Sequence, residues 1–154
     1  EYNSKPEQKK LEKIIELGED YLKKYNGVNS FFVSSYVKKA KKILRDGDNI
    51  LVEVEAEDKE YLFFGTKLTV EAIKNEDKVS KIIKSGKKES IGELKIKGVF
   101  GEKIFLNVST ENERGRNDSV VILEFGTESL ISEIEVDGKK IKLNIIQDYK
   151  NFKI

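Results

Sequence analysis

The chain has 154 residues, 29 of them basic and 28 acidic, and 38% are hydrophobic. This length suits one domain with a real core. A net charge of +1 provides no field that gathers phosphates, so we expect no nucleic-acid partner. The sequence has no Cys and no His, which excludes disulfides, thiolate nucleophiles and the commonest metal ligands and general bases. We therefore predict no bound metal and no other cofactor.

Lysine far outnumbers arginine, which occurs only at Arg45, Arg114 and Arg116. This bias is typical of an AT-rich genome and favours a bacterial source. The sequence contains no Met, so we expect it to be part of a longer protein whose missing segment carries a signal or a lipid anchor. We accordingly expect an extracytoplasmic location, at the outer surface or in the periplasm. The longest fully apolar run, residues 120–123, is too short to span a bilayer.

Two helices are predicted in residues 1–47. Residues 4–7 read Ser-Lys-Pro-Glu, a capping-box pattern, and Asn26-Gly27 supplies a stop. A second helix begins near residue 29 or 30 and ends at Asp46-Gly47. The apolar residues at helical spacing are Leu11, Ile14, Ile15, Leu22 and Tyr25 in the first helix, and Val33, Tyr36, Val37, Ala40, Ile43 and Leu44 in the second. The short connector predicts an antiparallel helical hairpin.

From residue 48 onward the apolar period changes to two, which indicates strands. Residues 50–57 predict a half-buried strand, and residues 57–60 a turn into a second strand at 61–64. A third, short helix is expected within residues 76–85. The stretch 66–73 fits either a strand or a helix.

The rest of the chain predicts strand after strand: 93–100, 103–109, 119–125, 130–136 and 140–146. Gly101-Glu102 joins the first two tightly, residues 110–118 form a polar loop, and Asp137-Gly138 is a type I′ hairpin signal. The predicted fold is a single α+β domain over residues 1–154. A helical hairpin packs on a curved antiparallel sheet, with the third short helix between strands.

This order of elements, carried by residues 5–26, 30–45, 49–64, 76–85 and 93–146, resembles the nuclear transport factor two-like (SnoaL-like) superfamily. The resemblance implies a cone in which a curved sheet wraps around helices, often with a central pocket and with dimers formed through the sheet. Members include both enzymes and binding modules. The enzymes commonly place Asp, His or Tyr in the pocket, and this sequence has no His. In composition the chain also resembles surface lipoproteins of Lyme-type spirochaetes.

The acidic row Glu53, Glu55 and Glu57 lies on one face of a predicted strand. Alternate carboxylates can bind Ca²⁺ or act as an acid/base pair. No calcium-binding loop pattern accompanies them. A solvent-facing strand kept soluble by its charges is the better interpretation.

Partner binding is predicted at residues 111–122. Arg114 and Arg116 lie in a loop of this lysine-rich chain, and arginine forms bidentate pairs that lysine cannot; a mobile mixed-charge loop is the alternative. Val120 and Ile122 give the strand 119–125 a second apolar face, which a half-exposed antiparallel strand should not have. We predict that a partner or another copy covers this face, the alternative being the third helix or the C-terminal tail at Tyr149 and Phe152.

Six aromatic residues are candidates for lining a small-molecule pocket between helices and sheet: Phe31, Phe32, Tyr36, Tyr61, Phe63 and Phe64. The alternative is that they belong to the ordinary core, because aromatic side chains dominate cores.

These patterns predict a non-catalytic protein–protein interaction domain of a bacterial extracytoplasmic or surface protein, which binds another protein or itself as a homodimer. The alternative is a pocket enzyme or small-ligand binder of the nuclear transport factor two-like kind, using Asp, Glu or Tyr. A third possibility is an adhesin-like module that binds a host protein.

Overall fold

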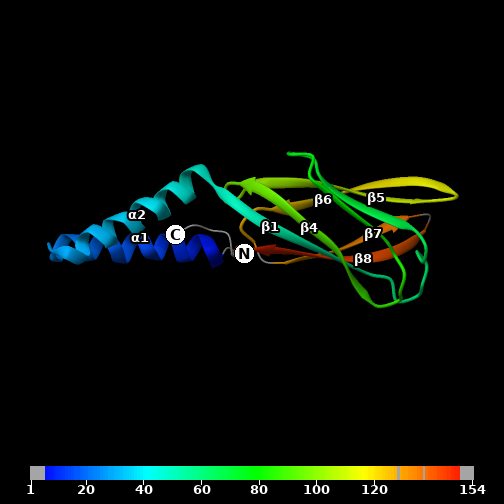
Figure 1. Cartoon of the computed structure of the whole chain (residues 1–154), viewed down its shortest axis with the longest axis horizontal. Helices are drawn as coiled ribbons and strands as arrows, with labels where there is room; N and C mark the ends of the chain where they lie inside the picture. The colour runs from blue at the N-terminus through cyan, green and yellow to red at the C-terminus, as the bar shows by residue number, and fades with distance from the viewer. Residues whose placement is uncertain (1–5, 128, 137, 150–154) are drawn as a thin grey trace.

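A helical hairpin projects from one end of a β-sandwich in the computed structural model, which describes residues 6–127, 129–136 and 138–149 (Figure 1). The hairpin comprises α1 (Pro6–Lys24) and α2 (Val28–Asp46). The strands are β1 (Asp48–Glu57), β2 (Lys67–Ala72), β3 (Lys78–Ile82), β4 (Lys88–Gly98), β5 (Lys103–Asn112), β6 (Gly115–Glu124), β7 (Leu130–Val136) and β8 (Lys139–Asp148).

The strands form two four-stranded antiparallel sheets, in the orders β4-β1-β8-β7 and β3-β2-β5-β6. The chain passes from one sheet to the other after β1, β3, β4 and β6. Each sheet therefore contains strands that are distant in sequence, such as β1 and β8. Long-range pairing of this kind places the first and the last strand side by side in one sheet.

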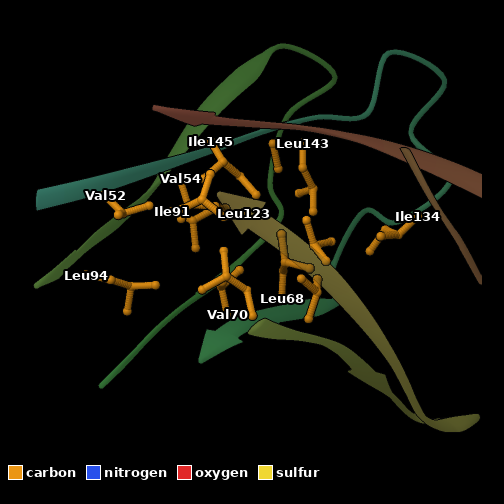
Figure 2. Packing of buried hydrophobic residues seen from close by; sticks show 14 of the residues in the cluster. Val52, Val54, Leu68, Val70, Ile91, Leu94, Leu123, Ile134, Leu143 and Ile145 are labelled. Carbon is orange, nitrogen blue, oxygen red and sulfur yellow. The ribbon is translucent and has the colours of Figure 1, made fainter. Parts of the chain in front are cut away.

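The core lies between the two sheets and follows from alternation along each strand. In β1, Val52, Val54 and Ala56 point inward, and the intervening glutamates point outward. Figure 2 shows Val54 and Ile145 from one sheet above Leu68 and Val70 from the other. Fully burying a Val, Leu or Ile side chain stabilises a fold by about 1.5–3 kcal/mol, so this layer is the main source of stability.

The two helices pack closely because Gly18 in α1 presents no side chain. A Cβ at this position would collide with Val37 of α2. Glycine inside a helix costs about 0.5–1 kcal/mol relative to alanine, and here it permits the close approach. Leu11, Ala40 and Ile43 form the buried centre of the hairpin.

Phe100 connects the hairpin to the sandwich. It lies in the turn between β4 and β5, and it packs against both the sandwich core and the core of the hairpin. Its ring meets Phe125 edge-on, with 5.5 Å between ring centroids and an interplanar angle of 79°. The other link is Gly47, whose positive φ of 85° and contact with the carbonyl of Gly98 leave no room for a Cβ. The hairpin thus leaves the sandwich in one fixed direction.

An ion pair fixes the turn that carries Phe100. The Lys74 ammonium donates to the Glu102 Oε2 at 2.7 Å and to the carbonyl of Lys97 at 2.8 Å. The Val99 N–H donates to the Glu102 Oε1 at 3.1 Å. The hydrogen bond from Lys74 is the main cause that holds the pKa of the Glu102 carboxyl below its ordinary value, against the opposing effect of desolvation.

The structure confirms the coarse prediction of an N-terminal helical hairpin followed by antiparallel strands. The third helix expected within residues 76–85 is wrong, because residues 78–82 form β3, which pairs with β2. Residues 61–64 are not a strand either, since they belong to the connection that crosses between the sheets. The ambiguous stretch 66–73 contains strand β2.

The predicted cone is also wrong. The strands form two separate sheets packed face to face, and the helices extend beyond them instead of lying inside a curved sheet (Figure 1). The capping box at residues 4–7 falls mostly outside the described residues, as do Asp137 and Phe152. The tight β7–β8 hairpin expected at Asp137-Gly138 is present, because Val136 pairs with Lys139.

We expect Phe100→Ala to lower the free energy of unfolding by about 2–3 kcal/mol, because it removes a ring shared by two cores. Phe31→Ala is the matched control: Phe31 is exposed on α2, so its loss should cost about 0.5 kcal/mol or less. Urea unfolding followed by circular dichroism measures both. Equal costs for the two variants would contradict the role assigned to Phe100.

Glu102→Gln should change how stability depends on pH. The pKa of Glu102 is lower in the folded chain than its ordinary value of 4.5, so its stabilising effect is present above pH 4.5 and is lost as the pH falls through the folded pKa. The difference in unfolding free energy between wild type and variant should be largest at neutral pH and shrink in acid. Glu135→Gln, at an exposed position on β7, is the control for the loss of a carboxylate. A difference that is independent of pH would argue against this ion pair.

Candidate interaction surface

The outer face of β6 brings together three of the residues predicted to bind a partner. Arg116, Val120 and Ile122 alternate along this strand and point away from the core, whereas Val121 and Leu123 point into it. Val120 is 58% exposed and Ile122 51% exposed. The strand therefore has two apolar faces, and the described part of the chain leaves the outer one open to solvent.

Neighbouring strands extend this apolar surface. Phe105 on β5 pairs with Ile122, and the N–H of Ile73 donates to the carbonyl of Phe105 at 3.1 Å. Both side chains are exposed. We call Ile73, Phe105, Val120 and Ile122 the β6 patch. Contiguous exposed apolar groups of this kind mark interaction sites more often than scattered single residues do.

The backbone of β6 is the second feature of this surface. The strand ends its sheet, so only β5 pairs with it among the described strands. Arg116 contacts Asp118 at 3.2 Å, which places charges along the first half of the edge. The second half, residues 119–123, carries no charge. An uncharged edge with free backbone groups is a template for pairing with another strand.

Arg114 lies beyond this edge, in a two-residue turn between β5 and β6. The long polar loop predicted at residues 110–118 is wrong, because Asn112 pairs directly with Gly115. The turn borders a surface depression of about 630 Å³, which Phe63 and Phe64 also line. Arg114 and Arg116 therefore lie on different surfaces: Arg114 lines the depression, and Arg116 precedes the β6 patch along the strand.

The six aromatic residues proposed for one pocket do not come together. Phe31, Phe32 and Tyr36 are exposed on α2, whereas Tyr61, Phe63 and Phe64 lie in the β1–β2 connection at the opposite end of the molecule. Within the second group, Phe63 is buried in the core and the rings of Tyr61 and Phe64 are 6.1 Å apart. These residues therefore do not form a pocket between the helices and the sheet.

The acidic row Glu53, Glu55 and Glu57 faces outward on the other sheet. Glu55 accepts a hydrogen bond from Asn144 and pairs with Lys88, both at 3.2 Å. Glu57 lies 3.9 Å from Lys59. Among the described residues, no three His, Cys, Asp or Glu side chains are grouped so that they could hold a metal ion. The row is a charged face balanced by its neighbours.

Two buried polar residues that the sequence did not single out are structural. The Asp58 carboxylate accepts hydrogen bonds from the N–H groups of Leu62 and Phe63, at 3.1 and 2.6 Å, and so shapes the β1–β2 connection. The Gln147 amide accepts from the N–H of Gly126 and donates to the carbonyl of Glu124, each at 2.9 Å. The polar atoms of both side chains are therefore hydrogen-bonded within the fold.

No protein family and no curated protein was found to match the sequence. A solved structure of a C2 domain is similar, with a TM-score of 0.43 and 6% identity over 65% of this chain and 97% of that chain. The strand pairing of this chain gives two four-stranded sheets and not a nuclear transport factor two-like cone, so the family resemblance inferred from the order of elements is wrong. None of the described helices meets the length and hydropathy needed to cross a bilayer.

Arg114→Ala combined with Arg116→Ala should change the free energy of unfolding by about 0.5 kcal/mol or less, because both side chains are exposed and the Arg116–Asp118 pair lies in water. Thermal unfolding measures this. A partner that uses the turn would bind the double variant more weakly than the wild type. A large loss of stability would instead show that the arginines hold the fold together.

Proposed function

We propose that this chain is a non-catalytic protein-interaction domain that binds its partner along β6. The observation that carries the proposal is the exposure of Val120 and Ile122, on a strand whose other face is already buried in the core. An antiparallel sheet with one face in water alternates apolar and polar residues, and this strand does not. A partner surface would remove both side chains from water.

The proposed partner binds by adding a strand to the open edge. Backbone hydrogen bonds supply affinity in this mode of recognition, and side-chain contacts supply specificity. The uncharged residues 119–123 offer the backbone, and Phe105 and Ile73 widen the apolar contact. Arg116 and Asp118 at the start of the strand would bound the contact with polar groups, as the rims of interfaces usually do.

A second copy of the chain is the simplest partner with suitable chemistry. In an antiparallel pairing of two β6 strands centred on Val120, Arg116 of each copy would stand opposite Glu124 of the other. Opposite charges in directly facing positions stabilise a strand pair. A two-fold axis would also bring the two β6 patches side by side.

The source and the cellular location of the protein are a separate proposal. We propose that the domain belongs to a bacterial extracytoplasmic or surface protein, and the preference for lysine over arginine supports the bacterial source. If the protein that binds this edge of β6 comes from a host, the domain would have an adhesin-like role.

Val120→Lys with Ile122→Lys should abolish binding along β6 while leaving the chain folded. The charges would be solvated in the free chain, because both positions are exposed, but they would be buried in a complex. Sedimentation velocity over a range of concentrations should show a dimer for the wild type and a monomer for the variant.

Ile131→Lys is the matched control, since Ile131 is an equally exposed isoleucine on β7, the edge strand of the other sheet. It should keep the mass of the wild type. The proposal fails if wild type and double variant have the same mass and bind the same proteins, or if the double variant unfolds, which would place Val120 and Ile122 in the internal core.

A further inference from the structure

The free end of the helical hairpin carries exposed apolar side chains that no other element of the described residues covers. Tyr25 directly follows α1, Val28 begins α2, and Phe31 and Phe32 come shortly after it. Val28 is 83% exposed and Phe31 74% exposed. We call Tyr25, Val28, Phe31 and Phe32 the hairpin tip. It lies at the end of the molecule farthest from the sandwich (Figure 1).

The tip is not required for packing between the two helices. Gly18 and Val37 form the close contact, with Val33 beside them, and these residues occupy the facing sides of α1 and α2. The ring contacts of the tip are local: Phe31 meets Phe32 edge-on at 5.7 Å, and the Tyr25 ring is tilted against Tyr21 at 4.8 Å. Aromatic surface of this size left in water forgoes a large stabilisation unless it binds something.

The hairpin has an excess of basic residues: residues 6–46 contain ten Lys and Arg and six Asp and Glu. Residues 21–44 contain six lysines and neither Asp nor Glu, in a chain whose net charge is +1. Lys23 and Lys24 directly precede the tip, and Lys38, Lys39, Lys41 and Lys42 follow it on α2. These side chains are exposed. Glu16, Glu19 and Asp20 lie on the facing part of α1, and Glu19 pairs with Lys41, so the hairpin is a mixed but net basic element that ends in aromatic residues.

The order of residues along α2 matches the layers of a membrane interface. Eight positions separate Val28 from Tyr36, about 12 Å along a helix. Lys38 and Lys39 come immediately after, and the Lys39 ammonium lies 5.9 Å from the centre of the Tyr36 ring. Interfacial segments bury apolar side chains to a depth of about 5–10 Å, with tyrosines at the headgroup level and lysines reaching outward to phosphates.

We propose that the hairpin tip docks peripherally on an anionic lipid bilayer. The aromatic side chains enter the headgroup region, and the lysines bind lipid phosphates and carboxylates. A convex end suits a soft, deformable surface, and the net positive charge of the hairpin suits an anionic one. Asn26 in the connector and Asn29 in the first turn of α2 fit the hydrated headgroup layer and would be disfavoured deeper in the membrane.

Docking of this kind leaves the rest of the molecule free. The hairpin is braced by the Lys41–Glu19 ion pair, at 2.9 Å, and by its own core. It would hold the sandwich away from the lipid, with the β6 patch accessible to a protein. The inference does not depend on the proposed function, because the two surfaces share no residue.

A tryptophan placed at the tip can report insertion directly, because the chain has no Trp of its own. We expect the fluorescence of Phe31→Trp to shift to shorter wavelength with vesicles of phosphatidylcholine containing 30 mol% phosphatidylglycerol, and bromine-labelled lipids to quench it. Phe105→Trp, in the β6 patch, is the control and should show neither change. The same emission for both probes would overturn the proposal.

Vesicle sedimentation separates the contribution of the aromatic residues from that of the lysines. Phe31→Ser with Phe32→Ser should lower the partition coefficient of the full chain on these vesicles at least tenfold. Lys23→Glu with Lys24→Glu should also lower it at least tenfold, because each lysine near an anionic surface contributes about fivefold. Lys139→Glu with Lys140→Glu, at exposed positions in the sandwich, is the matched control and should bind like the wild type. Circular dichroism confirms folding of every variant.

Three results would overturn membrane docking. The first is no binding of the wild-type chain to anionic vesicles at low salt. The second is equal binding to vesicles of pure phosphatidylcholine, which would exclude the role of the lysines. The third is vesicle binding that the tip variants leave intact while they lose a protein partner, which would assign the hairpin tip to protein recognition instead.

Discussion

The packing of one ring, Phe100, against two cores determines the shape of this molecule. The hairpin alone buries little apolar surface, because its centre is a small cluster around Leu11, Ala40 and Ile43. Two helices of this length are marginal unless tertiary contacts support them. The contacts made by Phe100, and the positive φ of Gly47, connect the base of the hairpin to the end of the sandwich. Through these contacts the large core of the sandwich also stabilises the projecting hairpin.

This arrangement separates the two exposed apolar surfaces. The hairpin tip lies far from the sheets, and the β6 patch lies on the outer face of one of them (Figure 1). Neither surface can be covered by the other within one chain. A protein partner along β6 and a lipid surface at the tip could therefore act at the same time, and a dimer would present two basic hairpins, which would strengthen docking through multivalency.

The sequence predicted those parts of the fold that depend on local periodicity. It indicated the helical hairpin, the strands after residue 90 and the two faces of β6. It misassigned β3, because Val79, Ile82 and Ile83 have spacings of three and four that suit a helix, and the pairing with β2 overrode that preference. The division into two sheets was also missed, because alternation shows which residues are buried and not which strand lies beside which.

The hairpin tip shows how a correct local pattern can lead to a wrong assignment. Aromatic residues on a predicted helix suggest a core or a pocket, and Phe31, Phe32 and Tyr36 were interpreted in that way. What distinguishes them is the charge of the surrounding segment: residues 21–44 carry only lysines, although acidic and basic residues are nearly equal over the whole chain. A helix that packs inside a globular domain has no need of such a bias, since mixed charges solvate its outer face equally well. The lysines around Phe31, Phe32 and Tyr36 are therefore the sequence signal that could have separated these exposed aromatic residues from those of a core.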